Sequence, residues 1–118
     1  MTTQTLTVDG NTIALDAEGY LVSLADWSPA LATALAASEG RELTPDHWEV
    51  IDLMRAFYQR YEAAPAMRPL VKAMRQSLGE DKASSLYLMR LFPGSDSRET
   101  PAKIVARLAG LPKPTNCL

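Results

Sequence analysis

The stretch that decides the fold is Thr44-Pro-Asp-His-Trp-Glu-Val-Ile-Asp-Leu-Met-Arg-Ala-Phe-Tyr-Gln-Arg-Tyr61. Thr44 is a good N-cap residue, and proline at the first helical position loses no hydrogen bond, because that backbone donor is unsatisfied anyway. Large apolar residues then recur every three or four positions, which is the spacing of one helix face. They are Trp48, Ile51, Met54, Phe57 or Tyr58, and Tyr61. The pattern predicts a helix over residues 44–61, and we expect it to be the centre of the core.

The same kind of start signal appears on both sides of this helix. Ser28-Pro29 and Thr100-Pro101 each place a hydroxyl residue before a proline, and they predict helices over about 28–39 and 101–109. Apolar periodicity predicts two more helices, over about 67–78 and 81–91, with Gly79 between them as a helix stop. We therefore expect a mainly α domain of about five helices.

The N-terminal residues have the alternation of a β-hairpin. Leu6, Val8, Ile13 and Leu15 alternate with polar residues, which predicts a hairpin over 4–16 with one apolar face. A loop at Gly10-Asn11 pairs Val8 with Ile13 and Leu6 with Leu15, and we favour this register over a loop at Asp9-Gly10. The chain then leads to Trp27, whose aromatic side chain we expect in the core.

The last nine residues, Gly110-Leu-Pro-Lys-Pro-Thr-Asn-Cys-Leu118, contain the single cysteine of the chain, Cys117. Pro112 and Pro114 fix φ and remove two backbone donors, so this segment does not continue a helix. We expect a compact domain over residues 1–109 and a mobile C-terminal arm over 110–118. An exposed thiol near the end of such an arm has the accessibility that a reactive cysteine needs.

Composition restricts the class of protein. A chain of 118 residues with 47% hydrophobic residues fits one domain. No apolar run is long enough to span a bilayer, and the start of the chain lacks the basic residues of a signal peptide, so we expect a cytoplasmic protein without membrane association. One His and one Cys do not make a conventional zinc site, and we expect no cofactor or metal.

The predicted helices 67–78 and 81–91 also have the arrangement of a helix-turn-helix, so a DNA-binding regulator is an alternative. The second helix would offer two cations, Lys82 and Arg90, and Glu80 and Asp81 lie before it. With a formal net charge of −2 the chain has weak electrostatic attraction for phosphates. We therefore do not expect direct nucleic-acid binding.

Several segments resemble the DsrC/TusE family of sulfur-relay proteins, small carriers that hold sulfur on a penultimate cysteine. They cover nearly the whole chain in order: Asp16-Ala-Glu-Gly-Tyr-Leu21, Asp26-Trp-Ser28, Leu43-Thr-Pro-Asp-His-Trp-Glu-Val-Ile51, Arg68-Pro-Leu-Val-Lys72, Leu86-Tyr-Leu-Met-Arg-Leu-Phe-Pro-Gly94, and Ala109-Gly-Leu-Pro-Lys-Pro114 before Cys117. The resemblance implies that Cys117 carries a persulfide, as a sulfurtransferase-type carrier rather than a stand-alone enzyme. Residues Gly110, Leu111, Pro112, Lys113 and Pro114 would form the arm, and Lys103, Arg107 and Lys113 are candidate docking charges.

Two departures from the family pattern matter. Members that partner dissimilatory sulfite reductase have a second cysteine eleven positions before the penultimate one, and that position here is Ala106. The chain therefore resembles the single-cysteine, TusE-like branch, which implies a sulfur-donor relay complex upstream, an enzyme that makes 2-thiouridine in tRNA downstream, and a monomeric carrier. A single-cysteine DsrC-like partner in dissimilatory sulfur metabolism is the alternative. Residues 95–100 lengthen the loop before the last helix, and we expect a surface excursion that leaves the fold unchanged.

Overall fold

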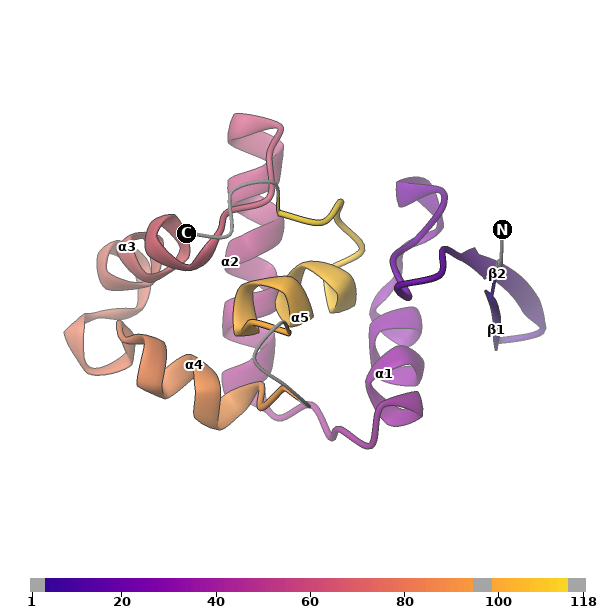
Figure 1. Cartoon of the computed structure of the whole chain (residues 1–118), viewed down its shortest axis with the longest axis horizontal. Coiled ribbons are helices and arrows are strands. Elements are labelled where there is room, and N and C mark those ends of the chain that lie inside the picture. The colour runs from indigo at the N-terminus through magenta and orange to yellow at the C-terminus, as the bar shows by residue number, and fades with distance from the viewer. Residues whose placement is uncertain (1–3, 95–98, 115–118) are drawn as a thin grey trace.

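The structure is a computed structural model, and it describes residues 4–94 and 99–114. Two strands form an antiparallel hairpin, and five α-helices and two short 3₁₀-helices follow (Figure 1). In chain order these elements are β1 (Gln4–Val8), β2 (Asn11–Leu15), η1 (Leu24–Asp26), α1 (Pro29–Ser38), α2 (Pro45–Tyr61), α3 (Met67–Leu78), η2 (Glu80–Lys82), α4 (Ser85–Leu91) and α5 (Pro101–Leu108). The predicted mainly helical domain with an N-terminal hairpin is confirmed.

The predicted helix starts have the expected caps. The Ser28 hydroxyl accepts a hydrogen bond from the Leu31 amide at 3.1 Å, and the Thr100 hydroxyl accepts one from the Lys103 amide at 3.3 Å. At the start of α2 the Thr44 amide donates to His47 Nδ1 at 3.0 Å. Local sequence therefore determined where these helices begin.

The hairpin register differs from the prediction. Leu6 pairs with Ile13 and Val8 pairs with Asn11, so the loop is Asp9-Gly10. Both loop residues have positive φ, 50° and 82°, as a two-residue turn that matches the twist of the strands requires. The error is a shift of two residues, which preserves the alternation, so the apolar residues still share one face.

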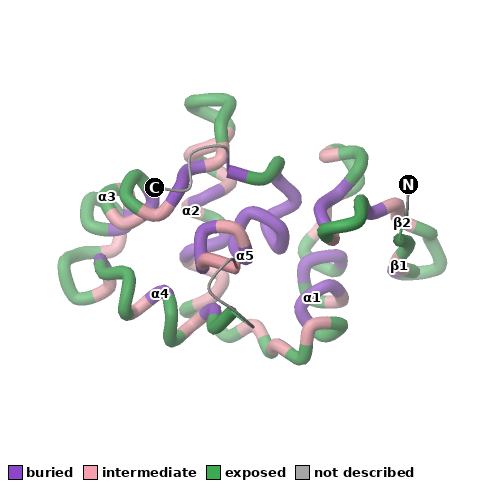
Figure 2. The backbone as a smooth tube through the Cα atoms, viewed as in Figure 1, coloured by how far each residue is buried: buried purple, intermediate pink, exposed green. Residues whose placement is uncertain are grey.

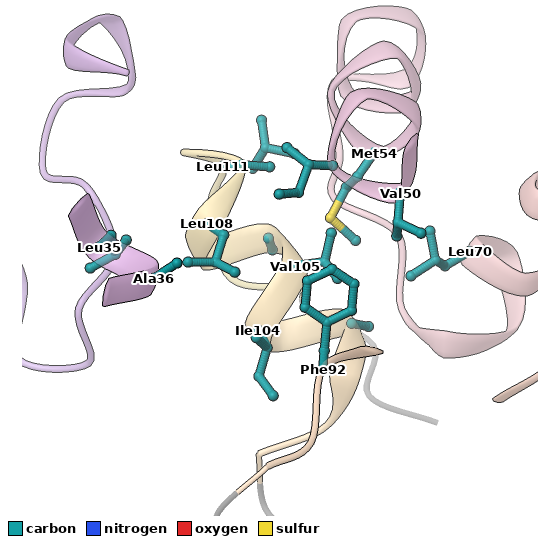
Figure 3. Close-up of a cluster of buried hydrophobic side chains, with 14 of the residues drawn as sticks. Leu35, Ala36, Val50, Met54, Leu70, Phe92, Ile104, Val105, Leu108 and Leu111 are labelled. Carbon is teal, nitrogen blue, oxygen red and sulfur yellow. The ribbon is translucent and has the colours of Figure 1, made fainter. Parts of the chain in front are cut away.

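The centre of the core is α5 rather than α2. Seven of its eight residues are buried, and it contacts α1, α2 and α3. Figure 3 shows Ile104, Val105 and Leu108 of α5 between side chains of α1 and α2. Helix α2 packs against it with Val50, Ile51 and Met54, which are fully buried. The apolar stripe of α2 is thus confirmed over its first three turns, whereas Tyr61 at its end is 58% exposed.

The helix predicted over 81–91 begins four residues later, at Ser85. The preceding residues Glu80–Lys82 form the separate 3₁₀-helix η2. The Ser84 hydroxyl accepts a hydrogen bond from the Tyr87 amide at 3.1 Å, so serine acts as the N-cap of α4. The pair α3 and α4 lies at the end of the molecule opposite the hairpin (Figure 1).

Candidate functional site

The candidate functional residue, Cys117, lies outside the described residues, as do Thr115, Asn116 and Leu118. The structure does describe residues 110–114, which connect α5 to that cysteine. The geometry of these five residues sets where Pro114, three positions before the thiol, lies on the domain.

Gly110 terminates α5 by turning the chain. It has φ +71°, a conformation that glycine adopts without steric cost. Its amide donates to the Arg107 carbonyl at 3.3 Å, and the Leu111 amide donates to the Ala106 carbonyl at 2.9 Å. These two bonds form a Schellman motif, which satisfies carbonyls that the end of a helix would leave unpaired.

Trp27 and Arg55 hold this turn from two other parts of the chain. The indole Nε1 of Trp27 donates to the Leu108 carbonyl at 2.9 Å, and one terminal guanidinium nitrogen of Arg55 donates to the Ala109 carbonyl at 2.7 Å. The guanidinium carbon of Arg55 also lies 3.7 Å from the centroid of the Trp27 ring. Burial lowers the pKa of Arg55, and the nearby Asp52 carboxylate partly opposes that effect.

The contact between Trp27 and Gly110 leaves no space for a side chain. A Cβ atom added at Gly110 would lie 2.2 Å from Trp27 Cδ1 and 2.6 Å from Cγ. The glycine is therefore required twice, by its positive φ and by the indole that packs on it. We call Trp27, Arg55, Gly110 and Leu111 the arm root.

The first part of the predicted arm packs against the domain. Leu111 is 4% exposed, and Gly110 and Pro114 are also buried, whereas Pro112 is exposed. Lys113 Nζ lies 2.9 Å from a carboxylate oxygen of Glu18, in an ion pair between two largely exposed side chains. Such a pair contributes about 0–1 kcal/mol. Gly110, Leu111 and Pro114 are thus buried beyond the expected boundary at 109, and the mobility of residues 110–118 stays a prediction.

The Arg107 side chain is buried and paired, whereas a docking charge is usually exposed. It is 8% exposed, and its guanidinium donates to both carboxylate oxygens of Glu39, at 2.8 and 2.9 Å, and to Glu99. Burial alone would lower the pKa of Arg107, but these two carboxylates outweigh it and raise the pKa above its ordinary value. The charge of Arg107 is therefore paired inside the domain, and its role as a docking residue stays a prediction.

Lys103 is half-buried on α5, and its carbonyl accepts a hydrogen bond from the Tyr20 hydroxyl at 3.2 Å. Sequence reasoning missed the roles of Arg55, Glu39 and Glu99, and it assigned Trp27 to the core without its contact to the arm. The one signal in the sequence was Gly110 itself, which predicts a helix C-cap. The partners of that glycine lie far away in the chain, and no periodicity points to them.

A shallow hollow of about 670 Å³ lies between the hairpin and the Arg107 ion pairs. Its charged lining includes Arg41, which is paired with Glu39 at 2.9 Å. Within residues 4–94 and 99–114, no group of three His, Cys, Asp or Glu side chains is arranged to hold a metal ion. In the same residues, no helix has the length and apolar character needed to cross a membrane.

The comparisons with known proteins agree with one another. The family model described as "DsrC like protein" matches residues 7–118. A sulfurtransferase TusE of Sodalis glossinidius is 53% identical over 110 residues, which are 93% of this chain and 97% of the relative. A sulfurtransferase TusE of Yersinia pestis is 51% identical over 113 residues, which are 96% of this chain and 99% of the relative.

Two solved structures have the same fold. The NMR structure of Allochromatium vinosum DsrC superposes with a TM-score of 0.87 at 45% identity, covering 99% of this chain and all of the other. The crystal structure of the oxidized γ-subunit of dissimilatory sulfite reductase, DsrC, from Archaeoglobus fulgidus superposes with a TM-score of 0.79 at 33% identity. That match covers 98% of this chain and all of the other.

Proposed function

The chain belongs to the DsrC-like protein family, and we propose that it is a sulfur carrier that accepts a persulfide sulfur on Cys117 and donates it to a second protein. One observation carries the proposal. Relatives named as sulfurtransferases match nearly the whole chain, and Cys117 is its single thiol. No other residue of the chain has the chemistry to hold a sulfane sulfur.

The transfer needs no catalytic group on the carrier other than the Cys117 thiolate. The Cys117 thiolate attacks the outer sulfur of a persulfide on a donor cysteine, a new S–S bond forms, and the S–S bond of the donor breaks. The donor leaves as a thiolate, and Cys117 becomes the persulfide, so no external oxidant or reductant is consumed. A thiolate on the next protein then attacks the outer sulfur and forms a new S–S bond, the S–S bond at Cys117 breaks, and Cys117 leaves as a thiolate.

A single thiol determines which partners suit this carrier. The second cysteine of the dissimilatory members is replaced by Ala106, which is fully buried in α5, so an internal disulfide does not form. We propose that the carrier acts in the cytoplasm, between a sulfur-donor relay complex and the enzyme that thiolates the wobble uridine of tRNA. The names of the relatives at about half identity support this over a role beside dissimilatory sulfite reductase.

The distance that Cys117 can reach depends on whether residues 110–114 stay packed on the domain. With residues 110–114 packed as described, the three residues from Pro114 to Cys117 span at most roughly 10 Å. Release of the chain from Gly110 onward would extend the span to roughly 25 Å. We propose that Gly110, Leu111, Pro112, Lys113 and Pro114 form the delivering arm, with Lys103 and Lys113 contacting partner proteins.

Mass spectrometry tests the proposal directly. After incubation with inorganic polysulfide, the parent protein is expected to gain one sulfur atom on Cys117, whereas Cys117→Ser gains none, because a serine hydroxyl is not nucleophilic enough at neutral pH. Deleting residues 111–115 is expected to leave this uptake intact but to slow transfer from a protein persulfide donor. Sulfur on the Cys117→Ser variant, or an unreactive parent thiol, would refute the proposal.

A further inference from the structure

A groove along α3 combines apolar side chains with exposed cations. It is a shallow hollow of about 530 Å³, lined by Met67, Arg68, Val71, Lys72 and Arg75 of α3 and by Ser85 at the start of α4. Three of these six residues are basic and none is acidic. We call these six residues the α3 groove.

The cations of the groove are available to a partner. Arg68 and Lys72 are exposed, and within residues 4–94 and 99–114 no carboxylate forms an ion pair with either of them. Arg75 has one long contact, 3.7 Å from its Nε to a carboxylate oxygen of Glu80, and both side chains are more than half exposed. These three side chains differ from Arg107, whose guanidinium is paired with Glu39 and Glu99 inside the domain.

Two exposed apolar side chains lie on α4, the helix that contributes Ser85 to the groove. Leu86 and Met89 are 58% and 56% exposed, and they lie on the outer face of α4, on the side away from the buried Leu88. Figure 2 shows that most residues of α4 are exposed. Large apolar side chains that gather on a surface, rimmed by charged ones, are typical of protein interaction sites.

We propose that the α3 groove, together with Leu86 and Met89, binds an acidic amphipathic helix of a partner protein. The apolar side chains would receive the apolar face of that helix, and Arg68, Lys72 and Arg75 would face its carboxylates. Complementary charge of this kind speeds association and sets orientation. The inference goes beyond the proposed sulfur carrier, because it involves neither Cys117 nor the arm root.

A protein partner suits this surface better than a nucleic acid. Phosphate-binding surfaces are dominated by cations and polar donors, whereas here Met67 and Val71 line the groove and Leu86 and Met89 are exposed on α4. Aromatic side chains for stacking on bases are also missing from the residues that line the groove. The formal net charge of −2 further weakens attraction to a polyanion, while a local basic groove is enough for one acidic helix.

The test uses the full chain and two synthetic peptides. The first is an amphipathic helix with leucines at i, i+3, i+4 and i+7 positions and glutamates beside them; the second has lysine in place of each glutamate. We expect the glutamate peptide to bind at least tenfold more tightly in fluorescence anisotropy, and its affinity to fall as salt is raised. Amide chemical-shift changes are expected on α3 and α4.

Two pairs of substitutions separate the charge from the apolar contribution. Arg68→Gln with Lys72→Gln should weaken binding about tenfold and reduce its salt dependence, and Leu86→Ser with Met89→Ser should weaken it at least fivefold. These side chains are exposed, so all four substitutions should leave the fold intact.

Two controls address net charge and thiol chemistry. Thr7→Glu with Asn11→Asp lowers the net charge by the same two units, but at exposed hairpin positions on the opposite end of the molecule, and it should leave binding unchanged. Cys117→Ser should bind the peptide normally, so failure of this proposal is distinct from failure of the sulfur-carrier proposal.

Several outcomes would overturn the inference. They are equal affinity for both peptides, an unchanged affinity in either groove variant, or shift changes centred on the hairpin. Tighter binding of a single-stranded RNA oligonucleotide, lost in Arg68→Gln with Lys72→Gln, would assign the surface to nucleic acid instead. Self-association in sedimentation velocity that the Leu86→Ser with Met89→Ser variant abolishes would assign it to a second copy of the chain.

Discussion

Replacing Gly110 with alanine tests the arm root most directly. The substitution adds a methyl group at φ +71°, which costs about 1 kcal/mol for an L-residue in the left-handed region. The new Cβ would also lie 2.2 Å from Trp27 Cδ1, so the indole has to move. That movement breaks the hydrogen bond from Trp27 Nε1 to the Leu108 carbonyl, worth about 1 kcal/mol, and weakens the stacking of Arg55, worth about another 1 kcal/mol.

The expected loss for Gly110→Ala is therefore about 3 kcal/mol of unfolding free energy. Gly40→Ala is a matched control, because Gly40 also follows a helix, has φ +74°, and has no atom within 4 Å of the added Cβ. The control should lose about 1 kcal/mol, the conformational cost alone.

Urea unfolding followed by circular dichroism at pH 7 measures both losses, with the slope of free energy against urea checked for constancy. A difference of about 2 kcal/mol between the two variants supports the close contact with Trp27. If Gly110→Ala costs no more than Gly40→Ala, the indole does not hold the turn as described, and the reasoning about the arm root fails.

Two further substitutions test buried polar groups. Arg107→Met should lose about 3 kcal/mol in the same urea assay, because it leaves the partly buried carboxylates of Glu39 and Glu99 without their shared cation. Adding Glu39→Gln and Glu99→Gln should recover part of that loss, and an Arg107→Met variant as stable as the parent would contradict a structural role for this ion pair. Tyr87→Phe should be neutral or stabilise by about 1 kcal/mol, because within the described residues the buried Tyr87 hydroxyl has no hydrogen-bond partner. Burial raises the pKa of Tyr87, because the folded state disfavours the charged form of the hydroxyl. The free energy of unfolding should therefore fall as pH rises above about 10 in the parent, and fall less in Tyr87→Phe. A loss above about 1 kcal/mol on removing the hydroxyl would show that it has a hydrogen-bond partner.

Much of the fold was predictable because its signals are local. Hydroxyl residues before Pro29, Pro45 and Pro101 predicted three helix starts, and Gly79 predicted the turn that ends α3. These features depend on residues within one helical turn, so a single sequence contains them. The candidate functional residue was predictable for a different reason, since a chain with one cysteine offers one thiol.

The errors concern choices that local signals leave open. The hairpin alternation predicted which residues share a face but not the pairing, because a shift of two residues preserves the face. Likewise, α5 is short, and its sequence is compatible with a helix that buries one apolar stripe. In the structure the helix is buried on nearly all of its faces, and Arg107 is among the buried residues. Its central place follows from three other helices packing around it.

The sequence by itself determined the class of elements, the start of most helices and the single thiol, Cys117. Only the tertiary structure decided that Trp27 and Arg55 meet at the end of α5 and that Glu39 and Glu99 neutralise Arg107. It also decided that Arg68 and Lys72 lie beside apolar side chains with no carboxylate partner among the described residues. The physical reason is separation along the chain. Contacts such as that of Trp27 with Leu108 join residues 81 positions apart, and they exist only once the crossing of the helices has been set by the packing of the whole core.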